Sequence, residues 1–163
     1  MNARSSILAF ALMSVAAAAP AAGTDADFAT KAGQANLAEV AAGRLAVSQG
    51  GRDDVKTFGQ RMIDDHSKAN DELAAAAATS GASVPTGPSV RQQAGAAELA
   101  RLRGAAFDAR YADMMVKDHQ EAVALFRKES GSGADPALRE FARKTLPVLE
   151  THLKMAKDLR HAR

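Results

Sequence analysis

Three clusters of glycine, serine and proline interrupt a chain that is otherwise rich in helix-forming residues, and they limit the folds that it can adopt. The clusters fall at Gly50-Gly51, at residues 79–88 and at residues 130–133. The stretches between them are dominated by Ala, Leu, Met, Lys, Arg and Glu, which favour helices. Aromatic residues make up only 4% of the chain, so the composition does not suggest a sheet. The pattern predicts an all-α fold.

The spacing of the breakers predicts four long helices, over residues 25–49, 53–78, 105–129 and 136–160. Asp135 and Pro136 are typical of the N-cap and first position of the last helix. A single helix over residues 89–130 would be about 60 Å long, so we expect a break near Gly104 and a short crossover helix before it. Two antiparallel hairpins joined by a long crossover make a ferritin-like four-helix bundle.

The first 21 residues have the composition of a signal peptide. Arg4 precedes an uncharged apolar run over residues 7–19, and Ala19-Pro20-Ala21 fits the small-residue pattern before a cleavage site. A membrane anchor is the alternative, but a spanning helix needs about 20 apolar residues. We therefore expect a signal peptide over residues 1–21, a bundle domain over residues 22–163, and a periplasmic or secreted protein.

Composition excludes several classes of function. The chain has no cysteine, which rules out thiol nucleophiles, disulfides, zinc fingers and iron–sulfur clusters. Its net charge of +2 is small and dispersed, so we expect no nucleic-acid partner. It contains no nucleophile elbow, glycine-rich phosphate loop or zinc-protease motif. No enzymatic activity follows from the residues alone.

The face of each long helix that we expect to be buried carries apolar residues every three or four positions. The predicted lines include Ala35 in the first helix and Val148 in the last. Each line is interrupted near its middle by one possible metal ligand: Glu39, His66, His119 and His152. Three imidazoles and one carboxylate converging in a bundle core are typical of a metal or cofactor site, with Fe, Mn, Zn or Cu as candidate ions. The alternative is that the histidines only form hydrogen bonds within the core.

Two aspartates complete the candidate metal set. Asp65 and Asp118 each precede a histidine by one residue, about 100° around a helix. They would either accept a hydrogen bond from an imidazole on the adjacent helix, act as ligands, or remain solvated. Met62 and Met115 lie one turn before two of the histidines, and sulfur ligands would favour copper.

Three separated blocks of sequence resemble a bacterial family catalogued as domain of unknown function 4142. The blocks are FGQRMIDDHSKAN (residues 58–70), FDARYADMMVKDHQEAVALF (107–126) and TLPVLETHLKMAKDL (145–159). The resemblance implies an exported, ferritin-like helical protein, and some members carry the label of outer-membrane protein. It implies no activity.

One departure from ferritin-like oxidases bears on function. Their di-iron sites use Glu-x-x-His on two helices. Here the residues three positions before the histidines are Ile63, Val116 and Leu149. We therefore do not expect ferroxidase chemistry.

Three roles remain open from the sequence. The first is a metal-binding bundle with a role in metal handling or envelope stress, and the second is a non-catalytic envelope or stress protein with structural histidines. The third is a module that associates peripherally with the cell envelope, or with a partner, through basic residues of the last helix. These residues are Arg139, Arg143, Lys144, Lys154, Lys157 and Arg160. The oligomeric state does not follow from the sequence.

Overall fold

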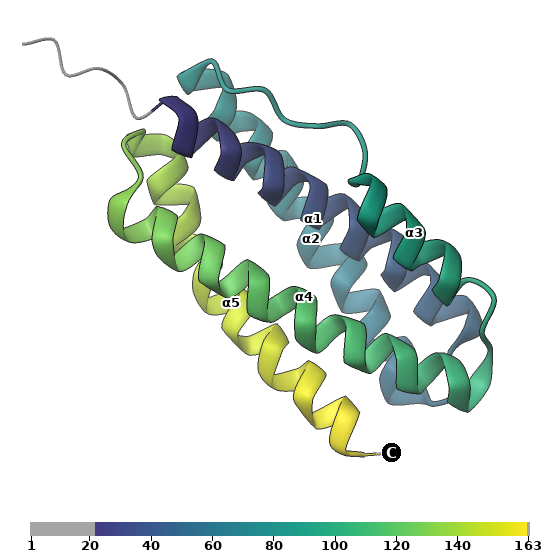
Figure 1. The fold of residues 1–163 in the computed structure, drawn as a ribbon. Helices are drawn as coiled ribbons and strands as arrows, with labels where there is room; N and C mark the ends of the chain where they lie inside the picture. The colour runs from purple at the N-terminus through teal and green to yellow at the C-terminus, as the bar shows by residue number, and fades with distance from the viewer. Residues whose placement is uncertain (1–21, 163) are drawn as a thin grey trace, which may run out of the picture.

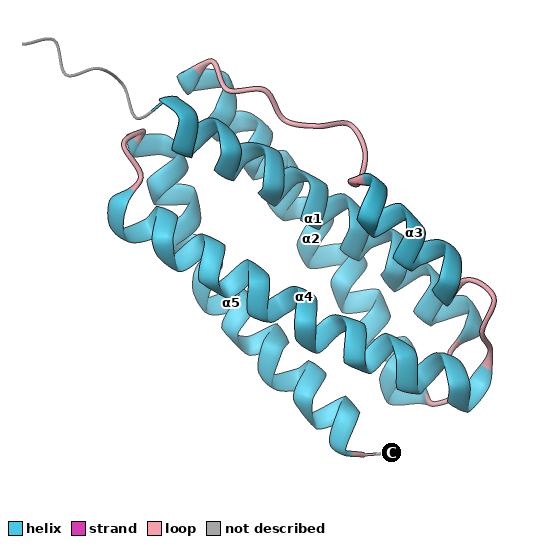
Figure 2. Ribbon diagram, in the orientation of Figure 1, coloured by secondary structure: helices cyan, strands magenta, loops and turns pink. Residues whose placement is uncertain are grey.

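The computed structural model describes residues 22–162, so the predicted signal peptide lies outside the described residues. Within that range the chain forms helices and no strand, which confirms the all-α prediction (Figure 2). The helices are α1 (Ala22–Gln49), α2 (Asp53–Ser80), α3 (Val90–Leu99), α4 (Gly104–Ser132) and α5 (Pro136–His161). None of the described helices is both long and apolar enough to cross a membrane.

The four long helices pack side by side as two hairpins (Figure 1). Helix α1 packs along α2, and α4 packs along α5. The hairpins meet through contacts of α2 with α5 and of α1 with α4. The chain crosses between them through an extended linker and α3, which lies against α1 and α4.

The observed helix boundaries agree with the predicted cap at Asp135 but differ from the prediction at the start of α1, which begins at Ala22 and not at Asp25. The Asp135 carboxylate accepts a hydrogen bond from Leu138 N at 2.8 Å, with Pro136 in the first turn of α5. The short helix begins at a capping box formed by Ser89 and Gln92. The prediction that residues 130–132 form a turn is wrong, because α4 continues through Ser132. Serine hydroxyls there bond carbonyls of the preceding turn, which lets a helix end accommodate them.

Buried aspartates close both ends of the assembly. At one end the Asp108 carboxylate accepts hydrogen bonds from the backbone of Gly51 at 2.9 Å and Arg52 at 3.1 Å. At the other end the Asp25 carboxylate accepts them from Ala134 at 3.2 Å and Asp135 at 2.7 Å. Each aspartate thus binds the turn of the other hairpin, so the relative position of the two hairpins is fixed at both ends.

Helices α1 and α2 approach one another closely at two glycines, Gly43 and Gly59. A Cβ atom at Gly43 would lie 2.6 Å from the Gly59 carbonyl oxygen, and one at Gly59 would lie 2.6 Å from Ala46 Cβ. Only residues without a side chain allow the backbones to come so near. The contact lies one turn from Glu39 along α1.

The core consists of two apolar clusters, and the histidines lie between them. Along α2 the first cluster ends at Met62 and the second begins at Ala69, with His66 between. The same order holds around His119 in α4, and the reverse order holds around His152 in α5. The three histidines therefore form a polar layer across the middle of the interior.

The α5 residue that packs in the core next to this layer is Leu149, at 3% exposure. The predicted line placed Val148 there, and this was wrong, because Val148 is 38% exposed. The two positions differ by about 100° around the helix.

Candidate metal centre

His66, His119 and His152 come from three different helices and meet in the interior. Their exposed fractions are 3%, 1% and 1%, and their ring centroids lie 5.4 to 5.6 Å apart. One nitrogen of each ring lies within 4.8 Å of one nitrogen of each other ring. The three imidazoles thus form a nearly equilateral triangle.

Each histidine uses one ring nitrogen to bond a neighbouring acceptor. His66 Nδ1 bonds Asn36 Oδ1 at 3.1 Å, and His119 Nδ1 bonds the Met115 carbonyl at 2.9 Å. His152 Nε2 bonds Asp65 Oδ2 at 2.8 Å. A carbonyl or carboxylate oxygen only accepts, so these nitrogens carry the proton of the neutral imidazole. The hydrogen bonds therefore assign the tautomer of all three rings.

The remaining nitrogens carry lone pairs and have no hydrogen-bond partner. They are Nε2 of His66, Nε2 of His119 and Nδ1 of His152, and all three are buried. Burial lowers the pKa of all three imidazoles, that of His119 to about 4, and mutual repulsion lowers the pKa of His66 and His119 further. The rings are neutral at pH 7, which is the form that binds a metal.

The triangle is nearly the right size for one ion. Even if all three sides were 4.8 Å, its centre would lie about 2.8 Å from each nitrogen, whereas bonds from imidazole to zinc are about 2.0–2.1 Å. Small rotations of the rings, of about 0.7 Å at each nitrogen, would bring all three into bonding distance. Acceptors on the outer nitrogens of histidine ligands are the usual supporting arrangement.

Glu39 lies beside the cluster and not at its centre. Its Oε1 is 3.8 Å from His119 Nδ1, the protonated nitrogen, and its Oε2 is buried without a partner. Burial raises the pKa of Glu39 well above its usual range, and the nearby Asp118 raises it further. A carboxyl group in such a place is neutral unless a cation joins it.

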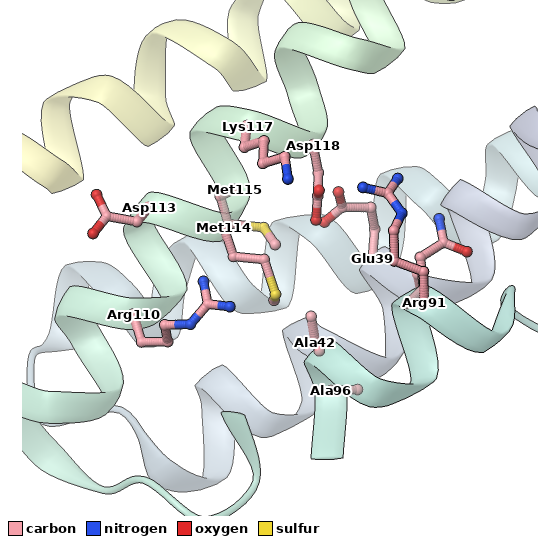
Figure 3. Close-up of a pocket in the computed structure, with 13 residues that line it drawn as sticks. Glu39, Ala42, Arg91, Ala96, Arg110, Asp113, Met114, Met115, Lys117 and Asp118 are labelled. Atoms are coloured by element: carbon pink, nitrogen blue, oxygen red, sulfur yellow. The ribbon is translucent and has the colours of Figure 1, made fainter. Parts of the chain in front are cut away.

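The two predicted aspartates occupy different positions. Asp65 is half-exposed and bonds both His152 and Arg61, so it orients an imidazole from the adjacent helix. Asp118 is half-buried and faces Glu39, as Figure 3 shows. Asp65 thus lies on one side of the histidine cluster and bonds His152. Glu39 and Asp118 lie next to one another on a different side.

The structure adds two polar residues that sequence reasoning did not assign to the site. Asn36 supports His66 and is 3% exposed, whereas Ala35, which was predicted on this line, is only half-buried. Asn36 lies three residues before Glu39, and this helical spacing was the signal in the sequence that could have placed it on the same face. Tyr111 is fully buried with no partner for its hydroxyl group, and burial raises its pKa.

The structure is thus that of an all-helical protein with a buried layer of three neutral histidines. Residues 11–159 match the family described as Domain of unknown function (DUF4142), and the chain belongs to that family. The resemblance in the three sequence blocks is thereby confirmed. No curated protein matches the chain.

A solved structure with a similar fold is that of a DUF305 protein from Streptomyces coelicolor, named as a candidate secreted protein. The TM-score is 0.70 at 14% sequence identity, and the match covers 83% of this chain and 89% of that one. At this identity the similarity concerns the fold alone.

Proposed function

We propose that this chain is an exported metal-binding protein that holds one divalent first-row transition ion at His66, His119 and His152. Its architecture is the ferritin-like four-helix bundle, with α3 as part of the crossover. Its role is metal handling in the cell envelope, where it sequesters the ion in the protein interior. Residues 1–21 act as the signal peptide.

The observation that carries the proposal is the set of three unpartnered nitrogens. Leaving a buried acceptor without a partner costs about 1–3 kcal/mol, and here three such acceptors belong to three histidines of one buried cluster. A core of purely structural histidines would pair these nitrogens with donors. One cation satisfies all three at once, because each nitrogen already has its lone pair free.

The donor set limits the choice of ion. Neutral imidazole suits zinc, copper and iron, whereas manganese prefers oxygen ligands and binds most weakly in the divalent series. Three protein ligands leave one position of a tetrahedral ion open. Water is one candidate for that position, and Glu39, a buried carboxyl group beside the cluster, is another. We therefore rank zinc, copper and iron above manganese.

Export rests on separate support. The apolar run over residues 7–19 and the small residues that follow it are typical of a cleaved signal peptide. The similar Streptomyces coelicolor protein is itself named as a candidate secreted protein. Both observations favour the periplasm or the cell exterior as the destination.

The test is metal analysis of the mature, untagged protein. Wild type, His119→Ala and His161→Ala are dialysed anaerobically against equal amounts of Fe²⁺, Mn²⁺, Zn²⁺ and Cu²⁺ and then washed. His161 is the matched control, because it is exposed at the end of α5, away from the cluster. We expect about one ion per chain in wild type and His161→Ala, and none in folded His119→Ala. A wild-type protein without bound metal would overturn the proposal and leave the histidines a structural role.

A further inference from the structure

A groove between α1, α3 and α4 leads from the surface to the edge of the histidine layer. It consists of two adjoining hollows of about 300 and 540 Å³. Both are lined by Ala38, Glu39, Arg91, Gln92 and Asp118. Exposed side chains such as Arg91 form the rim, whereas Glu39 is buried at the floor.

Glu39 connects this groove to the candidate metal centre. Its side chain is 6% exposed, one carboxyl oxygen lies 3.8 Å from the His119 ring, and the other is buried without a partner. Met115, whose carbonyl accepts from His119, also lines the first hollow. Glu39 and Met115 therefore line the groove and also lie next to His119.

Asp118 is half-buried and lies beside Glu39. Figure 3 shows the carboxyl groups of Asp118 and Glu39 directed toward one another from α4 and α1. Two cations of the rim are paired, Arg91 with Glu121 at 3.0 Å and Arg110 with Glu98 at 3.0 Å. A third cation, Lys117, also lines the first hollow and lies near Asp118 (Figure 3). Two adjacent carboxyl groups, one of which has a buried oxygen without a partner, favour a divalent cation.

The opposite side of the cluster offers a poorer route. Asp65 reaches the surface near His152, but its carboxylate already bonds His152 at 2.8 Å and Arg61 at 3.2 Å. The charge of Asp65 is already compensated by the Arg61 guanidinium, so this carboxylate attracts an incoming cation less strongly. The carboxyl pair in the groove has no such hydrogen-bonded cation, so the groove is the more favourable path.

We propose that the Glu39–Asp118 pair is a capture site for the divalent ion, through which the ion passes from the groove to the histidines. The inference rests on the proposed function, because it requires that the histidines bind a metal. Asp118 binds the ion first, at the surface side of the groove, and Glu39 binds it next, at the buried edge beside His119. The same carboxyl groups act in release, since loading and release follow one path in opposite directions.

The test compares the kinetics of cobalt loading in apo wild type, Asp118→Asn and Asp113→Asn. Asp113 is the matched control, because it lies on α4 at the margin of the same groove and points away from Glu39 in Figure 3. Stopped-flow absorption of Co²⁺ gives the loading rate, a chelator chase gives the release rate, and titration gives the affinity.

We expect Asp118→Asn to slow loading and release by about tenfold or more at low salt, with little change in affinity, since local charge accelerates capture by about 10–10³. Asp113→Asn should load within about twofold of wild type. Wild-type rates in Asp118→Asn would overturn the capture site while leaving the histidine site intact. Weaker binding with an unchanged loading rate would also overturn it, because Asp118 would then be a ligand. A wild type that binds no cobalt would overturn both proposals.

Discussion

The buried histidines make the stability of the metal-free protein fall as the pH is lowered. The substitution His119→Leu measures the contribution of one of them. In the folded protein, burial and the nearby His152 lower the pKa of His119 from 6.5 to about 4. The unfolded chain therefore binds a proton at His119 between pH 6.5 and 4 that the folded chain does not. The stabilising contribution is present in full above pH 6.5 and is lost as the pH falls toward 4.

The size of the effect follows from the two pKa values. One pKa unit corresponds to about 1.4 kcal/mol, so His119 contributes about 3 kcal/mol across this window. Buried carboxyl groups act in the opposite direction. The pKa of Glu39 is raised by burial, and that of Glu129 is raised to about 7, so their ionised forms destabilise the fold at higher pH. The wild-type profile alone is therefore ambiguous, and the difference from a variant is needed.

The assay is urea unfolding of wild type and His119→Leu at several pH values in the presence of a chelator. We expect the free energy of unfolding of wild type to fall, relative to the variant, by about 3 kcal/mol between pH 7 and pH 4. The carboxyl contributions are common to both proteins and largely cancel. Parallel profiles would refute the conclusion that His119 is buried in its neutral form.

Three further predictions concern the site and the packing around it. Asp65→Ala removes the acceptor of His152 and should weaken zinc binding by about 10–100-fold in a calorimetric titration, whereas Asp64→Ala, at the exposed neighbouring position, should not. Zinc at 100 times its dissociation constant should stabilise the protein by about 2.7 kcal/mol and raise the thermal midpoint by roughly 5–10 °C, and the same shift in His152→Ala would contradict the site. Gly43→Ala should destabilise the fold by about 1–3 kcal/mol, because the new methyl group meets α2 backbone at 2.6 Å. A Cβ atom added at Gly131 meets open space, so Gly131→Ala should raise the free energy of unfolding in urea by up to about 1 kcal/mol. Equal effects of Gly43→Ala and Gly131→Ala on stability would refute the close approach of α1 and α2.

Much of the fold was predictable because its signals are local. The helix ends are set by Gly50-Gly51, by the proline-containing linker over residues 79–88 and by Asp135-Pro136. Each of these signals depends on only a few adjacent residues. The end of α4 was less predictable, since Ser130 and Ser132 bond carbonyls of the preceding turn and tolerate helix or turn equally. The errors at Ala35 and Val148 have another cause. A shift of one position rotates a side chain by about 100°, and the contacts that decide between neighbours come from other helices.

The sequence was enough to predict which residues form the site. It was not enough to predict their relative positions and hydrogen bonds. A single polar residue amid each apolar face identified Glu39, His66, His119 and His152. Their roles depend on tertiary geometry, which places Glu39 beside the cluster and supplies Asn36 as the acceptor for His66. The choice of ring nitrogen likewise depends on acceptors that belong to neighbouring helices or turns.

The central claim is that one ion binds at the three unpartnered nitrogens, and anomalous diffraction at the zinc edge tests it most directly. Crystals of the mature, untagged protein grown with Zn²⁺ should show one strong peak at about 2.0–2.1 Å from Nε2 of His66, Nε2 of His119 and Nδ1 of His152. A map with no peak in the histidine layer, or with zinc only at surface groups such as His161, would contradict the account.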